Sequence, residues 1–359
     1  MTVAPQLDPE RVQQIAGTAI GALTGAFTAG MIYVGGELGL YRAMANAGPL
    51  TSTELAARTG LHERWVREWL RGQGAAGLID YKGGERFELS PEGALCLVDD
   101  ATPASVIGSF TAFPQRMTKL QFTTESFRTG RGRTYDEGGE VAALCVEGML
   151  GPWNRSALLT DALPALPGIV DRLQAGGTVC DIGCGSGVAL LAMAKAFPKT
   201  EFHGYDDSVH ALARARLNLQ ESGVTNVHFH NPDHIPLPSE PTFDLVMCLD
   251  CLHDMTRPDL VAAAIRKAIR DDGTWFVVDV ECSEDYEENR KLPMAAMLYA
   301  VSVMSCLSSS TSSEDGLALG TAGLPATKME RLVNDAGFTH FARVAGLHHP
   351  VNAYYRVTP

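Results

Sequence analysis

Positive charge is scarce in this chain. Lys and Arg number 29 against 42 Asp and Glu, and the formal net charge is −13. A surface of that sign repels phosphate backbones and anionic headgroups, so we exclude a broad nucleic-acid surface and a patch for anionic lipid. Internal repeats with a period of roughly 20–50 residues are also absent from the sequence, which argues against solenoid and propeller folds.

A dense cysteine framework is missing as well. The eight cysteines are scattered, and Cys180 and Cys248 fall in stretches that predict core strands; this usage suits a reducing cytoplasm. Cys248 and Cys251, with Cys282 further on, have no second closely spaced pair, so we expect no metal site. Residues 1–10 carry acids and prolines instead of a basic segment, so we expect no signal peptide and a cytoplasmic location.

One long stretch has no charge of either sign. Residues 12–36 contain no charged side chain and are numerous enough to span a bilayer. They are rich in Gly, Ala and Thr and poor in Leu and Ile, and Gln13 and Gln14 stand near their start. We therefore predict a buried or dimer-forming helix and no membrane partner, because small residues suit helices that pack closely.

The most informative stretch runs from Thr178 to Gly187. Its pattern predicts a buried strand, a tight turn and then a helix from Val188 to Phe197. A dinucleotide-binding loop would need a third glycine where Val188 stands, so this spacing opposes a nicotinamide oxidoreductase. Asp181 lies two residues before the first glycine, where a carboxylate suits a ligand with a cationic amino-acid end. The turn carries glycines at alternate positions, Gly183, Gly185 and Gly187.

Three more strands are predicted downstream. Residues 202–206 end in Asp206, about 20 residues past the glycines, where a carboxylate can accept both ribose hydroxyls. Residues 227–230 form a short strand followed by Asp233, and residues 243–249 form a strand that we expect to be fully buried. The order and spacing resemble those of class I S-adenosylmethionine-dependent methyltransferases, and the resemblance covers Gly177 to the C-terminus.

The resemblance implies a fold, a cofactor and a set of binding residues. It implies a doubly wound α/β domain whose seven-stranded sheet has its last strand antiparallel, with S-adenosylmethionine as cofactor. In this family a side chain at the position of Asp233 can bond the adenine amino group. The implied cofactor-binding residues are Asp181, Gly183, Gly185, Gly187, Asp206, Asp207, Asp233, His234 and Leu249.

The segment before this domain predicts a winged helix. Two short helices, the second with Trp65, Trp69 and Leu70 facing the core, precede a hairpin around Gly83 and Gly84. Between residues 51 and 90 six basic and six acidic side chains cancel, whereas a DNA-reading helix carries surplus positive charge. The segment resembles the N-terminal dimerisation domain of small-molecule O-methyltransferases, which implies a homodimer and no nucleic-acid partner.

We predict three regions: a winged-helix dimerisation domain at residues 1–98, a helical connector at 99–174, and the methyltransferase domain at 175–359. The connector includes a glycine-rich insert at residues 129–139. In two-domain methyltransferases of this type such connecting helices cap the site and contact the substrate. The resemblance therefore implies substrate contacts from Tyr135, Trp153 and Asn154.

Residues 249–255 carry the predicted chemistry. They resemble the L-H-D-W motif of plant and bacterial O-methyltransferases, with Met255 where the family has Trp, so Met255 is expected to shape the acceptor pocket. The resemblance implies His253 as the general base, oriented by Asp254 or by Glu330 in the last helix. An imidazole suits this task because a hydroxyl acceptor must lose its proton near neutral pH. The alternative is that His253 only caps a helix or bonds a backbone carbonyl.

The sequence as a whole predicts methyl transfer from S-adenosylmethionine to a small-molecule acceptor, at oxygen. Two alternatives stay open. The acceptor atom could be nitrogen or sulfur, with proximity alone carrying the reaction. The chain could instead be a winged-helix transcriptional regulator whose methyltransferase-like domain senses a ligand; a basic helix face would favour that, and the neutral count opposes it.

Overall fold

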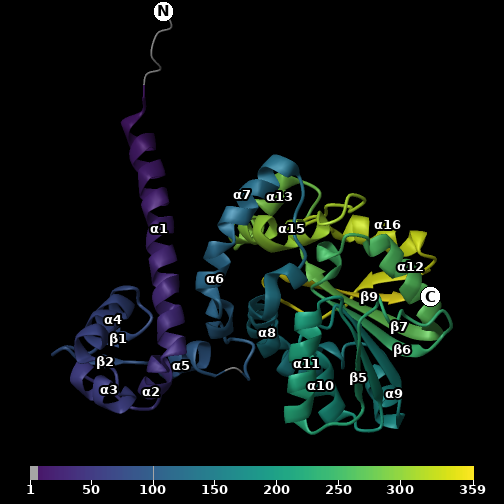
Figure 1. Ribbon diagram of the computed structural model, residues 1–359, viewed down its shortest axis with the longest axis horizontal. Coiled ribbons are helices and arrows are strands. Elements are labelled where there is room, and N and C mark those ends of the chain that lie inside the picture. The colour runs from purple at the N-terminus through teal and green to yellow at the C-terminus, as the bar shows by residue number, and fades with distance from the viewer. Residues whose placement is uncertain (1–6, 100) are drawn as a thin grey trace, which may run out of the picture. The chain divides into compact units, whose positions relative to one another are not determined.

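The computed structural model describes residues 7–99 and 101–359. The chain divides after Pro114 into two compact units, residues 1–114 and 115–359, which we describe separately (Figure 1).

The first unit begins with a long helix, α1 (Pro9–Glu37). Asp8 caps it by accepting from the backbone N–H of Glu10 at 3.0 Å, and Pro9 at the first turn needs no N–H partner. The helix ends with Leu38 as its C-terminal cap, and a short break at Gly39 follows. Gly39 adopts a left-handed φ of 67° before α2 (Leu40–Met44), a conformation that glycine tolerates.

The rest of this unit has the predicted winged-helix order. The elements are α3 (Ser52–Thr59), α4 (Glu63–Ala75), β1 (Asp80–Tyr81), β2 (Phe87–Glu88), α5 (Pro91–Leu97) and the 3-10 helix η1 (Ile107–Phe110). Trp69 and Leu70 are buried as predicted, but Trp65 is 79% exposed. That prediction was wrong because Val66 and Gln73, with Trp69 and Leu70, form the buried stripe of α4.

The second unit is built on a seven-stranded sheet with the order β5-β4-β3-β6-β7-β9-β8. Strands β3 to β7 are parallel, and β9 is antiparallel to both neighbours, which confirms the predicted topology. The strands are β3 (Thr178–Ile182), β4 (Glu201–Tyr205), β5 (Val227–His230), β6 (Phe243–Leu249), β7 (Ile269–Val280), β8 (His340–Arg343) and β9 (Asn352–Thr358).

Helices cover both faces of the sheet, and each face has its own apolar core. Leu245 and Met247 of β6 pack with α9 (Ile169–Ala175), α10 (Val188–Ala196) and α11 (Val209–Ser222). The alternate residues Val246 and Cys248 pack with α12 (Pro258–Ala268) and α16 (Ala326–Asp335). This alternation is the period of two expected for a strand buried on both faces.

Two helical segments of the second unit complete the fold (Figure 1). The segment before the sheet contains α6 (Phe113–Thr118), α7 (Leu120–Thr129), the 3-10 helix η2 (Asp136–Gly138), α8 (Gly139–Arg155) and the π-helix η3 (Leu158–Ala162). The segment between β7 and α16 contains α13 (Tyr286–Asn289), α14 (Ala295–Val301), the π-helix η5 (Ser302–Cys306) and α15 (Leu307–Ser310).

Candidate active site

The glycine loop, residues 183–187, joins β3 to α10. All three glycines have left-handed φ values, 70° at Gly183, 53° at Gly185 and 74° at Gly187. A Cβ at Gly187 would lie 2.4 Å from the Phe229 ring, and one at Gly183 would lie 2.9 Å from Cys251 Sγ. The loop therefore needs glycine for its backbone angles and, at two positions, for close packing.

Asp206 holds the glycine loop against the end of β4. One carboxylate oxygen accepts from the backbone N–H of Gly185 at 2.8 Å, and the other accepts from that of Ser208 at 2.9 Å. Burial raises the pKa of Asp206 to about 6, although these backbone N–H groups favour the ionised form. Asp207, the next predicted residue, lies at the same edge, and its carbonyl accepts from Asn231 at 3.1 Å.

Asp181 lies at the end of β3 with almost no exposed surface. Its Oδ1 atom has no hydrogen-bond partner among the described residues. Burial, reinforced by the charge of Asp206, raises the pKa of Asp181 well above its usual value. An unpartnered buried carboxylate is costly, so this place suits a ligand that brings a cationic or hydrogen-bond-donating group.

The remaining predicted cofactor residues lie along the same edge of the sheet. Asp233 and His234 are exposed in the loop after β5, where the Asp233 N–H donates to Asn231 at 2.9 Å. Leu249 is buried at the end of β6. The carboxyl ends of parallel strands are where open α/β sheets bind ligands.

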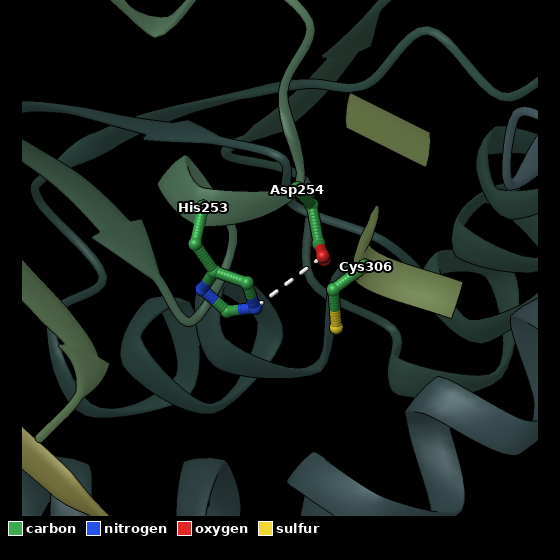
Figure 2. A group of neighbouring side chains, drawn as sticks. All are labelled: His253, Asp254 and Cys306. Atoms are coloured by element: carbon green, nitrogen blue, oxygen red, sulfur yellow. Dashed lines mark ion pairs between the residues drawn. The ribbon is translucent and has the colours of Figure 1, made fainter. Parts of the chain in front are cut away.

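His253 lies just past β6, in the 3-10 helix η4 (Leu252–Asp254), and is only 2% exposed. Its Nδ1 lies 2.7 Å from Asp279 Oδ1, and its Nε2 lies 3.3 Å from Asp254 Oδ1 (Figure 2). Burial alone would lower the pKa of His253, but the negative charges of Asp279 and Asp254 outweigh it, and the pKa lies well above its usual value.

Asp279, near the end of β7, was not predicted from the sequence. The signal was an acid inside the apolar run of residues 274–280. Asp250, also unpredicted, follows β6 with a left-handed φ of 61°, and burial raises its pKa to about 7. The structure shows Glu330 exposed on α16, and its role as an orienting acid stays a prediction.

The glycine-rich insert brings Tyr135 to the same place. Its hydroxyl lies 4.0 Å from Cys306 Sγ, and burial, followed by the charge of Asp254, raises the pKa of Tyr135 well above its usual value. Cys306 is buried at the end of η5 and was not predicted, because nothing near it in the sequence marks it. We call Tyr135, His253, Asp254, Asp279 and Cys306 the His253 cluster.

The glycine-rich insert also contacts the edge of the sheet where the predicted cofactor residues lie. Asp136 accepts from the Ser208 hydroxyl at 3.0 Å and from the Val209 N–H at 2.8 Å, at the start of α11. Its neighbour Tyr135 contacts the His253 cluster. A segment predicted to cap the site and contact the substrate thus also connects Asp206, which Ser208 contacts, with His253.

The other predicted substrate residues are placed differently. Met255 follows η4, two residues after His253, and its Cε lies 3.9 Å from the position of a Cβ at Gly183, so its side chain reaches the glycine loop. Trp153 stacks on Tyr354 with ring centroids 6.0 Å apart and packs against a sheet core. Asn154 is half-buried beside it on α8.

Two overlapping groups in this region could hold a metal ion. The ligand atoms of His253, Asp254 and Cys306 lie within 4.8 Å of one another, as do those of Asp250, His253 and Asp279. Both groups include His253, so a cation in either would occupy a nitrogen of the predicted base.

Comparisons with known proteins agree with this architecture. Residues 173–323 match the family model of a methyltransferase domain, and residues 26–98 match the model of an Rv2258c-like winged HTH domain. The second unit of this chain contains a methyltransferase domain. Ahead of it, the winged helix-turn-helix match confirms the predicted N-terminal fold.

The names of relatives of this methyltransferase domain indicate that they act on different molecules. A mitomycin biosynthesis 6-O-methyltransferase from Streptomyces lavendulae is 33% identical over 184 residues, which cover 49% of this chain and 52% of that protein. A ubiquinone biosynthesis O-methyltransferase from Aromatoleum aromaticum is 35% identical over 28% of this chain and 43% of its own length. The chain therefore spans about half or less of these curated relatives.

Solved structures match over nearly the whole chain. Human N-acetylserotonin methyltransferase in complex with SAM has a TM-score of 0.68 at 18% identity, covering 99% of each chain. Mitomycin 7-O-methyltransferase has a TM-score of 0.66 at 20% identity, covering 98% of this chain and 100% of that one. At such identities the likeness establishes a shared fold, with a winged-helix and a methyltransferase part.

Proposed function

We propose that the chain is an S-adenosylmethionine-dependent methyltransferase that acts on the oxygen of a small molecule, with His253 as general base. The observation that carries this is the position of His253 between Asp279 and Asp254 at the carboxyl edge of the sheet. The Cε atom of Met255, two residues on, lies 3.9 Å from the place that a Cβ at Gly183 would occupy. A base is thereby held next to the predicted cofactor site.

We propose that different residues bind different parts of the cofactor. The glycine loop offers close backbone approach, Asp206 offers its remaining acceptor capacity to ribose hydroxyls, and Asp181 offers an unpartnered oxygen to the amino-acid end. We assign the adenosine part to four residues at the same edge of the sheet: Asp207, Asp233, His234 and Leu249. When bound, S-adenosylmethionine supplies a methyl group on a sulfonium, a good leaving arrangement for in-line displacement.

His253 would receive the proton of the acceptor hydroxyl. Asp279 at Nδ1 fixes the ring and its tautomer, so that Nε2 is the basic nitrogen. Our candidates for contact with the acceptor are Tyr135, Met255, Trp153 and Asn154. A nitrogen or sulfur acceptor, methylated by proximity, would not need this base.

The winged-helix unit is proposed to form a homodimer rather than to read DNA. On α4, Arg64 pairs with Glu68 and Arg67 with Glu63, each at 2.7 Å, so its basic side chains are neutralised. The exposed apolar residues of α1 recur at helical spacing along one face: Val12, Ile15, Ile20, Leu23, Phe27 and Met31. We propose that a second copy covers this stripe.

By length and composition α1 could also cross a membrane, with a hydropathy of 1.5 in its most apolar window. The mostly buried core helix of a soluble protein passes the same test, but only 6% of this window is buried within one chain. We propose that a second copy covers it, in a cytoplasmic dimer. Phe27→Glu should convert the dimer to monomers in light scattering, whereas Trp65→Glu, an equally exposed aromatic outside the stripe, should not. A monomeric wild-type protein at all concentrations would end this proposal.

Calorimetry with S-adenosylmethionine tests the cofactor assignment. Asp206→Ala should weaken binding by at least about tenfold, since it removes a charged hydrogen-bond partner, whereas Asp335→Ala, an exposed acid on α16, should not. Methyl transfer is then assayed on a panel of phenols, amines and thiols, with and without a chelator. We expect phenols to react and the chelator to have no effect. If a folded Asp206→Ala variant binds S-adenosylmethionine with the affinity of the wild type, Asp206 is not part of the cofactor site.

A further inference from the structure

The two ring nitrogens of His253 have different partners. Nδ1 and Asp279 Oδ1 form a short hydrogen bond at 2.7 Å. Nε2 faces Asp254 Oδ1 at 3.3 Å, and this oxygen has no hydrogen-bond partner among the described residues. When His253 is neutral and donates from Nδ1, Nε2 carries a lone pair. Two acceptor atoms then face each other in a buried place (Figure 2).

The charges around these atoms are mostly negative. Asp279 on β7, Asp254 on η4 and Asp250 after β6 surround the ring, with the neutral groups of Cys306 on η5 and Tyr135 beside η2. A second buried oxygen, Asp279 Oδ2, also has no hydrogen-bond partner in the described part of the chain. No Lys or Arg side chain of residues 7–99 or 101–359 is paired with these three acids in the hydrogen bonds and ion pairs that we find. One imidazole therefore faces three carboxylates.

We propose, on the basis of the function proposed above, that the acceptor is a hydroxyl compound that carries a protonated amine close to its reacting hydroxyl. The ammonium group would donate to Asp254 Oδ1 while the hydroxyl faces Nε2. Tyr135 and Cys306 lie against the Asp254 carboxyl, but its Oδ1 has no donor once His253 is neutral. A buried oxygen in that state is costly, and an ammonium supplies both the charge and the hydrogen bond that it then lacks.

This occupant also explains how a histidine flanked by carboxylates can serve as a base. Before the acceptor enters, the site favours the imidazolium, because its positive charge is the nearest counter-charge of Asp254 and Asp279. The acceptor's ammonium takes over that role, and the Nε2 proton leaves to solvent. The neutral Nε2 then receives the proton of the reacting hydroxyl. The cationic acceptor thus makes the base available.

Matched acceptors test the proposal. The 2-, 3- and 4-(aminomethyl)phenols are compared with the corresponding ethylphenols, which have nearly the same shape and no charge. In at least one pair the aminomethyl compound should have a kcat/KM about 10- to 100-fold higher, the range of a hydrogen bond to a charged group. Asp254→Asn should remove most of this difference, and Asp335→Asn, an exposed acid on α16, should preserve it.

Proton release is the second readout. With S-adenosylhomocysteine present, calorimetry at pH 7 in buffers of different ionisation enthalpy should show proton release when an aminomethylphenol binds and none for its ethylphenol. Equal or better use of the ethylphenols, or a preference that survives Asp254→Asn, overturns this inference and leaves O-methylation standing. If phenols of both kinds are inert while amines or thiols react, the proposed oxygen chemistry fails first.

Discussion

The glycine loop and the His253 cluster lie at the same edge of one sheet but are built differently. The loop is five consecutive residues, and Asp206, which holds it, is 21 residues from Gly185. The cluster gathers side chains from Tyr135 to Cys306, 171 residues apart. The loop works through backbone geometry and the cluster through buried charge. Mutations should therefore separate binding of the cofactor from proton transfer.

The largest expected effect is at the cluster. His253→Ala should lower turnover by roughly 10²- to 10⁴-fold, the usual contribution of a positioned base. Affinity for S-adenosylmethionine, measured by calorimetry, should stay within a few-fold of wild type because the loop is untouched. His253→Gln should not restore the rate, since an amide cannot accept the proton. A parallel fall in affinity would show that the two regions are not separable.

The next effect belongs to the loop. Gly187→Ala places a Cβ 2.4 Å from the Phe229 ring at a φ of 74°, so cofactor affinity should fall by more than about tenfold. Gly168→Ala, before α9, is the matched control, because its φ of 73° is also left-handed, nothing lies within 4 Å of the added Cβ, and it lies outside the glycine loop. Strain alone costs about 1–2 kcal/mol, so Gly168→Ala should lower stability and leave cofactor affinity within a few-fold of wild type.

A smaller effect is expected at Asp279. The rate should rise with pH as His253 loses its proton. Because the pKa of His253 is raised, the midpoint of this rise should lie above pH 6.5, the usual pKa of a histidine being about 6.5. Asp279→Asn removes one of the two charges that raise this pKa, so the rise should move to lower pH. Rates are measured from pH 5 to 9 at saturating cofactor. If the pH–rate profile of Asp279→Asn matches that of the wild type, Asp279 does not influence the pKa of His253.

The smallest effect concerns the insert. A Cβ at Gly132 would lie 1.9 Å from the carbonyl oxygen of Ser308, so Gly132→Ala should shift the insert and its Tyr135. The acceptor KM should rise a few-fold, well below the roughly 100-fold cost of displacing a catalytic group by 1 Å. Gly72→Ala, which meets nothing within 4 Å on α4, is the control. Loss of cofactor affinity as well would mean that the insert, through Asp136, also supports the loop.

The comparison also explains what could be predicted from the sequence. The loop, Asp206 and the parallel strands were predictable because their signals are local: glycine spacing, an acid at a strand end, and apolar runs. His253 was found through a short motif directly after β6. Asp279 and Cys306 were missed because only the paired strands and the return of η5 bring them to His253. The prediction for Trp65 was wrong because Trp65 and Val66 both fit the helical spacing of Trp69 and Leu70. Only the packing of the folded unit decides which of the two is buried.

The pH dependence of methyl transfer tests the account most directly. The wild type and His253→Ala are compared from pH 5 to 9, with one phenolic acceptor and saturating S-adenosylmethionine. The account predicts that the wild-type rate rises through loss of one proton at a pH above 6.5, and that the variant is slow with no such rise. A variant whose rate and profile match the wild type within a few-fold would show that His253 is structural and that proximity carries the reaction.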